Sequence, residues 1–133
     1  MIYLLDVNAL VALGFLEHEF HHRTARWILK LSKKDVQLAT CAISELGFLR
    51  VLSQAPAYQV TIAQGKQLLA AFQASQAPKF SFISDDVRAD ELPRWANNPR
   101  QLTDGHLLQL AKKHGATLAT LDQSIPGAFV IPH

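Results

Sequence analysis

Short apolar runs alternate along the chain with longer segments in which apolar residues recur at helical spacing. Residues 2–5 form a brief run that is apolar on both faces, which is typical of a buried parallel strand, and residues 36–39, 80–83 and 117–121 form similar runs. Helical patterns occupy residues 8–16, 21–33, 42–52, 61–75 and 104–113, and residues 129–131 read as a short edge strand. This alternation predicts an α/β fold, a three-layer α/β/α sandwich around a mainly parallel sheet.

Several residues are expected to mark the ends of these elements. Asn8 is predicted to cap the first helix, Thr103 to cap the helix that begins at Asp104, and Gly115 to end that helix. The polar segment 85–99 carries two prolines, so we expect short helix and loop there. No internal repeat or inter-domain linker is visible, and residues 1–133 are predicted to form one domain.

Composition narrows the functional classes without choosing one. With 13 Lys and Arg against 11 Asp and Glu, the net charge of +2 is too mild to identify a nucleic-acid binder by itself. A single cysteine, Cys41, excludes an internal disulfide framework and suits a reducing compartment. The apolar runs are far shorter than the roughly 20 residues needed to cross a bilayer, and no export signal is visible. We therefore expect a cytoplasmic protein with no membrane contact.

Four of the acidic residues interrupt apolar sequence, namely Asp6, Glu45, Asp104 and Asp122. Asp6 and Asp122 follow predicted strands, and the carboxyl ends of strands are where ligands bind in open α/β sheets. Asp104 opens a helix, and Glu45 lies within another. If these two helices flank the two strand ends, all four carboxylates converge in one cleft.

Converging carboxylates would repel one another in a low dielectric and tend to take up protons, and a divalent cation removes that penalty. Mg²⁺ and Mn²⁺ prefer oxygen ligands, and a bound ion can hold a phosphodiester and activate water. Taken singly, each acid has an equally good structural explanation as a turn former, a partner of a helix dipole, or half of a salt bridge such as Glu45 with Arg50. That explanation is much weaker for all four together.

These residues make the chain similar to the PIN-domain ribonucleases of the VapC toxin family, which belong to type II toxin-antitoxin systems. The resemblance covers essentially the whole chain and rests on order, spacing and context of four segments: Leu5-Asp6-Val7-Asn8, Ser44-Glu45-Leu46, Leu102-Thr103-Asp104 and Ala119-Thr120-Leu121-Asp122. One departure is Gly105, where many members carry Ala. Gly lowers helix propensity by about 1 kcal/mol relative to Ala, so it is expected to loosen the turn that holds Asp104.

The resemblance implies a Mg²⁺- or Mn²⁺-dependent endoribonuclease with Asp6, Glu45, Asp104 and Asp122 as its catalytic residues. Asp6 and Asp104 would hold the principal ion, with Asp122 as a direct or water-mediated ligand, and Asn8 and Thr120 would give polar support. Glu45 would orient or deprotonate the attacking water, and one-ion and two-ion mechanisms both stay open. The implied partners are an RNA substrate, a cognate antitoxin protein and a second copy of the chain.

Basic and histidine side chains supply the expected RNA contacts, which are His22, Arg23, Arg26 and Arg100. A solubilising helix face explains the basic residues equally well. His18, His21 and His22 make a poor zinc site, because His21 and His22 point in different helical directions and no cysteine is near. Two other functional classes stay open: a receiver-like phosphoacceptor, which should also have an acidic pair and a strand-end Lys, and a non-catalytic binding or regulatory module on the same scaffold.

Overall fold

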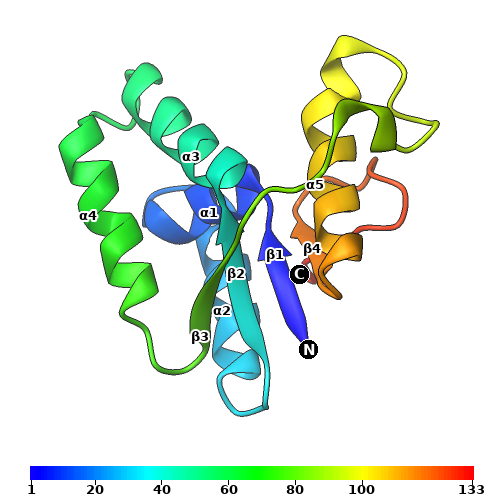
Figure 1. The fold of residues 1–133 in the computed structure, drawn as a ribbon. Coiled ribbons are helices and arrows are strands. Elements are labelled where there is room, and N and C mark those ends of the chain that lie inside the picture. Colours follow the sequence, from blue (N-terminus) through cyan, green and yellow to red (C-terminus); the bar gives the residue numbers. More distant parts are fainter.

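A computed structural model describes residues 1–133, which form a five-stranded, fully parallel sheet (Figure 1). The strand order is β3-β2-β1-β4-β5. The strands are β1 (Ile2–Leu5), β2 (Gln37–Cys41), β3 (Lys79–Ile83), β4 (Thr117–Thr120) and β5 (Phe129–Val130). The predicted α/β class with a parallel sheet is confirmed.

Five α-helices connect the strands: α1 (Val7–Gly14), α2 (His21–Leu31), α3 (Ala42–Gln54), α4 (Ile62–Gln73) and α5 (Leu102–Lys113). The polar segment before α5 contains two short 3₁₀ helices, η1 (Ala89–Glu91) and η2 (Pro99–Gln101), as its composition predicts. None of the helices is long and apolar enough to span a membrane.

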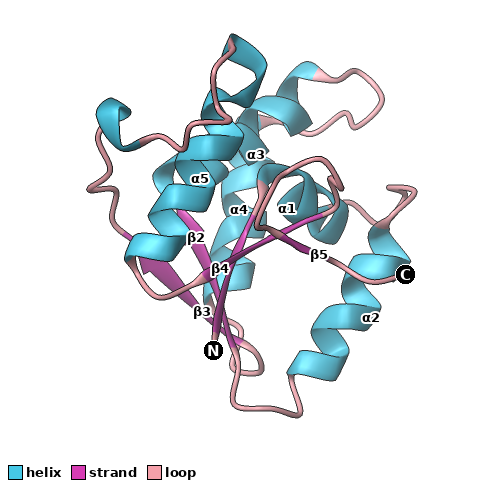
Figure 2. Cartoon of the chain, turned by 90° about the vertical axis from the view of Figure 1, so that its right-hand side faces the viewer, coloured by secondary structure: helices cyan, strands magenta, loops and turns pink.

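Alternating side chains of the central strands divide the core into two clusters, one on each face of the sheet. Leu5, Leu38 and Ala119 pack with buried residues of α1 to α4, while Leu4, Ala39 and Leu118 pack with buried residues of α5. All six side chains are completely buried, as expected of strands covered on both faces. The helices α1 to α4 therefore form one outer layer and α5 the other, which Figures 1 and 2 show from two directions.

The strand order reverses at β1. The connections from β1 to β2 and from β2 to β3 run through α1 to α4 on one face, whereas the connection from β3 to β4 runs through α5 on the opposite face. Ligands in such sheets bind in the crevice at the carboxyl ends of the strands where the order reverses, which here lies between β1 and β4. Receiver-type proteins have a different strand order, 2-1-3-4-5, so the topology contradicts the receiver-like alternative.

Two predicted helix caps are wrong. Asp6, not Asn8, is the N-cap of α1, since its Oδ1 accepts a hydrogen bond of 2.8 Å from the Val7 N–H. Thr103 lies inside α5, because the 3₁₀ turn of η2 leads directly into the helix at Leu102. Both helices therefore begin before the residue that was predicted to cap them. Gly115 ends α5 as predicted and has a φ of +68°.

Gly105 packs α5 tightly against the turn that precedes it, a constraint separate from its low helix propensity. Gly105 is buried, and a Cβ atom there would lie 2.6 Å from the Cβ of Ala96 and 3.3 Å from Cδ of Pro93. The Ala96 side chain cannot rotate away, so the backbone would have to move. The glycine thus allows the close approach that fixes the first turn of α5, which carries Asp104.

We predict that Gly105→Ala lowers the free energy of unfolding by about 1–2 kcal/mol, because overpacking outweighs the gain in helix propensity. In an Ala96→Gly background the obstructing atom is absent, and Gly105→Ala should then be neutral or stabilising. Urea unfolding of the four proteins in this double-mutant cycle measures the coupling. Equal effects of Gly105→Ala in both backgrounds would show that the contact does not constrain α5.

Candidate active site

The ends of β1 and β4 bring two of the predicted aspartates to the same edge of the sheet. Leu5 is in register with Ala119, and the Asp6 N–H donates to the Ala119 carbonyl at 2.9 Å, which extends the ladder by one residue. Asp122 lies two residues beyond β4. Parallel pairing therefore places both carboxylates at the carboxyl edge, in the crevice that the strand order defines.

Thr120 links these two strand ends through its buried hydroxyl group. The hydroxyl donates to Asp6 Oδ2 at 2.8 Å and accepts from the Asp122 N–H at 3.0 Å and from Asn8 Nδ2 at 3.1 Å. Asn8 also accepts from the Leu121 N–H through its Oδ1 at 3.1 Å. The side chains of Asn8 and Thr120 thus fix the position of the Asp6 carboxylate relative to the chain that carries Asp122.

The first turn of α5 adds Asp104, which lines a hollow of about 320 Å³ together with Asp6 and Asn8. His18 and Tyr58, from two loops, line the same hollow. Sequence reasoning missed both as members of the site, because neither lies in a motif and each is brought in only by the path of its loop. His18 is further held by its Nδ1, which accepts from the Phe20 N–H at 3.0 Å.

Burial and mutual repulsion raise the pKa values of two of the aspartates. The pKa of Asp104 rises to about 6, first because of burial and then because of the charges of Asp6 and Asp122. Burial also raises the pKa of Asp6, and the charge of Asp122 adds to that rise, while the hydrogen bonds from Thr120 and Val7 oppose it. Three carboxylates from three elements therefore act on one another.

Glu45 lies on the same edge of the sheet but in a separate set of contacts. It belongs to the first turn of α3, and its Oε2 accepts a hydrogen bond of 2.6 Å from Thr40, near the end of β2. The buried Ser44 next to it accepts from the Cys41 N–H at 2.9 Å and so fixes the same turn. Because β2 is the neighbour of β1, Glu45 faces the carboxyl edge, although it does not line the hollow.

The donor chemistry of Asp6, Asp104 and Asp122 fits a hard divalent cation. All three supply carboxylate oxygens, and their combined negative charge is the kind that such an ion relieves. No three His, Cys, Asp or Glu side chains are arranged closely enough to coordinate one metal ion without some movement. Both oxygens of Asp6 accept hydrogen bonds, and Asp122 Oδ1 accepts from the N–H and the hydroxyl of Ser124 at 2.8 and 2.7 Å. Each Asp6 oxygen keeps a second lone pair, and Asp122 Oδ2 accepts no hydrogen bond from the protein, so coordination can coexist with these bonds.

The four side chains predicted to contact RNA lie at separate places in the structure. Arg23 donates from its guanidinium to the Ile131 carbonyl and so ties α2 to the segment after β5. Arg26 lines a basic hollow near the C-terminal end of α2, together with Lys30, Lys33 and Lys34. His22 and Arg100 are exposed, on α2 and in η2 respectively. None of the four lines the hollow that holds Asp6 and Asp104.

The PIN-domain family model matches residues 3–127. The chain belongs to the PIN-domain family. Within the family it is similar to ribonuclease VapC38 of Mycobacterium tuberculosis, with 36% identity over 126 residues that cover 92% of this chain and 86% of the relative. It is also similar to ribonuclease VapC44 of the same species, with 35% identity over 134 residues that cover 94% and 92% of the two chains. The resemblance to VapC proteins is confirmed.

Two solved structures share the PIN fold of this chain. One is the crystal structure of Mycobacterium tuberculosis VapC20, a toxin that cleaves the sarcin-ricin loop, with a TM-score of 0.65, 14% identity and coverage of 98% and 99% of the two chains. The other is VapBC2 from Rickettsia felis bound to a DNA fragment from its promoter, with a TM-score of 0.65, 18% identity and coverage of 97% and 96%. At these identities the likeness shows the fold alone.

We predict that Asp104 makes the metal-free PIN domain progressively less stable, relative to a variant without this carboxyl group, as the pH rises from about 4 to about 6. The pKa of Asp104 is about 6 in the folded protein against 3.8 without the fold, so the folded state holds a proton that the unfolded state has already lost. Asp104→Asn should remove this loss. Above pH 6 its free energy of unfolding should exceed that of the wild type by about 1 kcal/mol, a value discounted for the partial exposure of Asp104.

Urea unfolding in the presence of chelator, repeated across this pH range, measures the effect. Asp35→Asn is the matched control, since Asp35 is an exposed acid in the loop between α2 and β2. The control should follow the wild type. Identical pH profiles for Asp104→Asn and the wild type would show that Asp104 is not under the repulsion described above.

Proposed function

We propose that this protein is a divalent-metal-dependent endoribonuclease and the toxin of a toxin-antitoxin pair. The observation that carries the proposal is the group of Asp6, Asp104 and Asp122 at the crevice between β1 and β4, where burial and mutual repulsion raise the pKa values of two of them. Relatives named ribonucleases, more than 30% identical over most of the chain, point to RNA as the substrate.

In this proposal Asp6, Asp104 and Asp122 hold Mg²⁺ or Mn²⁺. When bound, the ion supplies Lewis-acid stabilisation of the scissile phosphate and lowers the pKa of a coordinated water. Thr120 and Asn8 keep Asp6 oriented, as outer partners of metal ligands do. The apoprotein would repel a phosphodiester with the same three carboxylates, so RNA binding at the crevice depends on their neutralisation.

Glu45 acts as the base in this proposal. Thr40 occupies Oε2, which leaves Oε1 without a protein partner and free to orient or deprotonate the attacking water. His22 and Arg100 are exposed and stay candidates for phosphate contacts outside the crevice, and Arg26 is a candidate only for a longer RNA that reaches the C-terminal end of α2. Arg23 contributes through its bond to the Ile131 carbonyl, which positions α2.

The proposed partners are a cognate antitoxin and a second copy of the chain, and the proposed location is the cytoplasm. The antitoxin is inferred from the relatives named VapC, and the VapBC2 structure of the same fold supports it. A non-catalytic binding module would not need three mutually repelling carboxylates in one crevice, so no observation favours that alternative.

We predict that the purified protein cleaves structured RNA when Mg²⁺ or Mn²⁺ is added and stops when chelator is added. Asp104→Asn should lower the cleavage rate by about a hundredfold or more, because loss of a metal ligand removes several kcal/mol of charge stabilisation. Gel analysis of RNA fragments over time measures both effects.

Asp35→Asn again serves as the control and should cleave at the wild-type rate. Circular dichroism of Asp104→Asn should match that of the wild type, which separates loss of chemistry from loss of fold. Full activity of Asp104→Asn, or wild-type cleavage that persists in chelator, would overturn the proposed metal-dependent mechanism.

A further inference from the structure

A second hollow lies directly beside the acidic one and differs from it in chemistry. It has a volume of about 410 Å³ and five apolar lining residues, Ile43, Val87, Ala89, Leu92 and Leu102. Thr103, in the first turn of α5, lines both hollows, and the next residue is Asp104. The two hollows therefore meet at the same turn of a helix, with Thr103 as their shared wall.

We propose that this apolar hollow binds one nucleobase of the RNA strand whose backbone lies at the three aspartates. The inference rests on the proposed function and deepens it, because it identifies a site that would select the base next to the cleaved bond. Single-stranded RNA is read in this way, with a base turned out of the strand and held between apolar side chains.

The solvent exposure of apolar side chains that line the hollow supports the proposal that a ligand covers them. Ile43 and Leu102 are 36% and 47% exposed, although both border the site, and the hollow is large enough for a small ligand. A base offers two flat apolar faces that would cover these side chains. A phosphate would not suit the hollow, because Asp104 is adjacent and the lining residues include neither Lys nor Arg.

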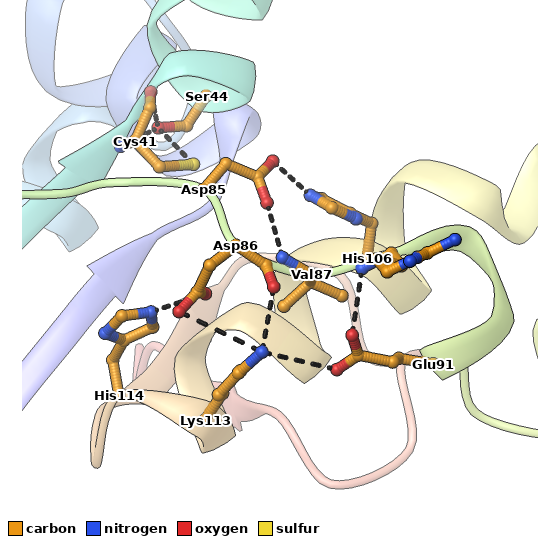
Figure 3. A network of polar contacts seen from close by, with 10 residues as sticks. Cys41, Ser44, Asp85, Asp86, Val87, Glu91, His106, Lys113 and His114 are labelled. Atoms are coloured by element: carbon orange, nitrogen blue, oxygen red, sulfur yellow. Dashed lines mark hydrogen bonds and ion pairs between the residues drawn. The ribbon is translucent and has the colours of Figure 1, made fainter.

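One polar side chain gives the hollow a means of recognising the edge of a base. His106 lines it, and its Nε2 lies 2.6 Å from Asp85 Oδ2. Figure 3 draws this pair as a dashed line. The carboxylate can only accept, so the hydrogen lies on Nε2, and Nδ1, which has no protein partner, is left to accept a hydrogen bond from a base. A mainly apolar pocket with a few oriented polar groups is the usual design of a small-ligand site.

The wall opposite α5 is held in place before any ligand arrives. Asp85 also accepts from the Val87 N–H at 3.0 Å, and His114 Nε2 lies 2.8 Å from Asp86 Oδ1. Lys113 Nζ donates to the Asp86 carbonyl at 2.8 Å and lies 3.6 Å from Glu91 Oε2 (Figure 3). These contacts fasten the segment between β3 and η1 to α5, so the hollow is preformed.

The test is to fill the hollow and to remove the base. Ala89 is exposed at the rim, so Ala89→Trp places a large side chain into the hollow without disturbing the core. Ala71→Trp, at an exposed position of α4, is the matched control. Each protein is incubated with Mn²⁺ and an RNA library containing a randomised stretch, and the cleavage positions are sequenced.

We expect the wild type and Ala71→Trp to favour one base at a fixed position relative to the cut. Ala89→Trp should lose that preference and cleave the favoured RNA about tenfold more slowly, the loss expected for one stacked base. On an RNA that is abasic at that position, the wild type and Ala89→Trp should cleave at equal rates.

Four outcomes would overturn the inference. Ala89→Trp could keep the wild-type base preference, or it could be slowed equally on intact and abasic RNA, which would indicate a steric effect on the backbone. An altered oligomeric state with unchanged base preference would assign the hollow to a protein contact. If the wild type leaves the library uncut in Mn²⁺, the proposed function itself fails, and the inference fails with it.

Discussion

The mutual repulsion of three buried or half-buried aspartates is the constraint on which the functional architecture depends. Asp6 is only 4% exposed, and burial followed by the charge of Asp122 raises its pKa. Burial followed by the charges of Asp6 and Asp122 raises the pKa of Asp104. Such an arrangement costs stability in the metal-free protein and is relieved by proton uptake or by a cation. The Thr120 hydroxyl group, bonded to both strand ends, keeps the carboxylates from moving apart.

Most of the fold and the central part of the site could be predicted from local sequence. The apolar runs predicted the strands, because buried parallel strands are apolar on both faces. Asp6 and Asp122 could be placed at the edge of the sheet because they closely follow two of these strands. The roles of Gly105, His18 and Tyr58 could not be predicted, since each depends on which loop packs against the site. The starts of α1 and α5 were also wrongly predicted, because Asp6 caps α1 while serving the site and η2 runs directly into α5.

The first turn of α5 connects two hollows of contrasting chemistry. On one side Asp104 contributes charge to a crevice suited to a cation and a phosphodiester, and on the other Leu102 and His106 border an apolar hollow suited to a neutral ring. The close contact between Gly105 and Ala96 positions this turn, and the His106–Asp85 pair fastens the far wall. In the proposed function, this one helix turn would set the position of the cleaved phosphodiester relative to the base that the apolar hollow binds.

Calorimetric titration of Mn²⁺ into the RNA-free protein tests the central claim most directly, because it examines ion binding without cleavage. The account predicts saturable binding to the wild type that is retained in Asp35→Asn. Binding should be strongly weakened in Asp6→Asn and in Asp122→Asn, although one residue follows β1 and the other follows β4. Absence of binding to the wild type, or wild-type affinity in both variants, would contradict the claim that these carboxylates form one ion site.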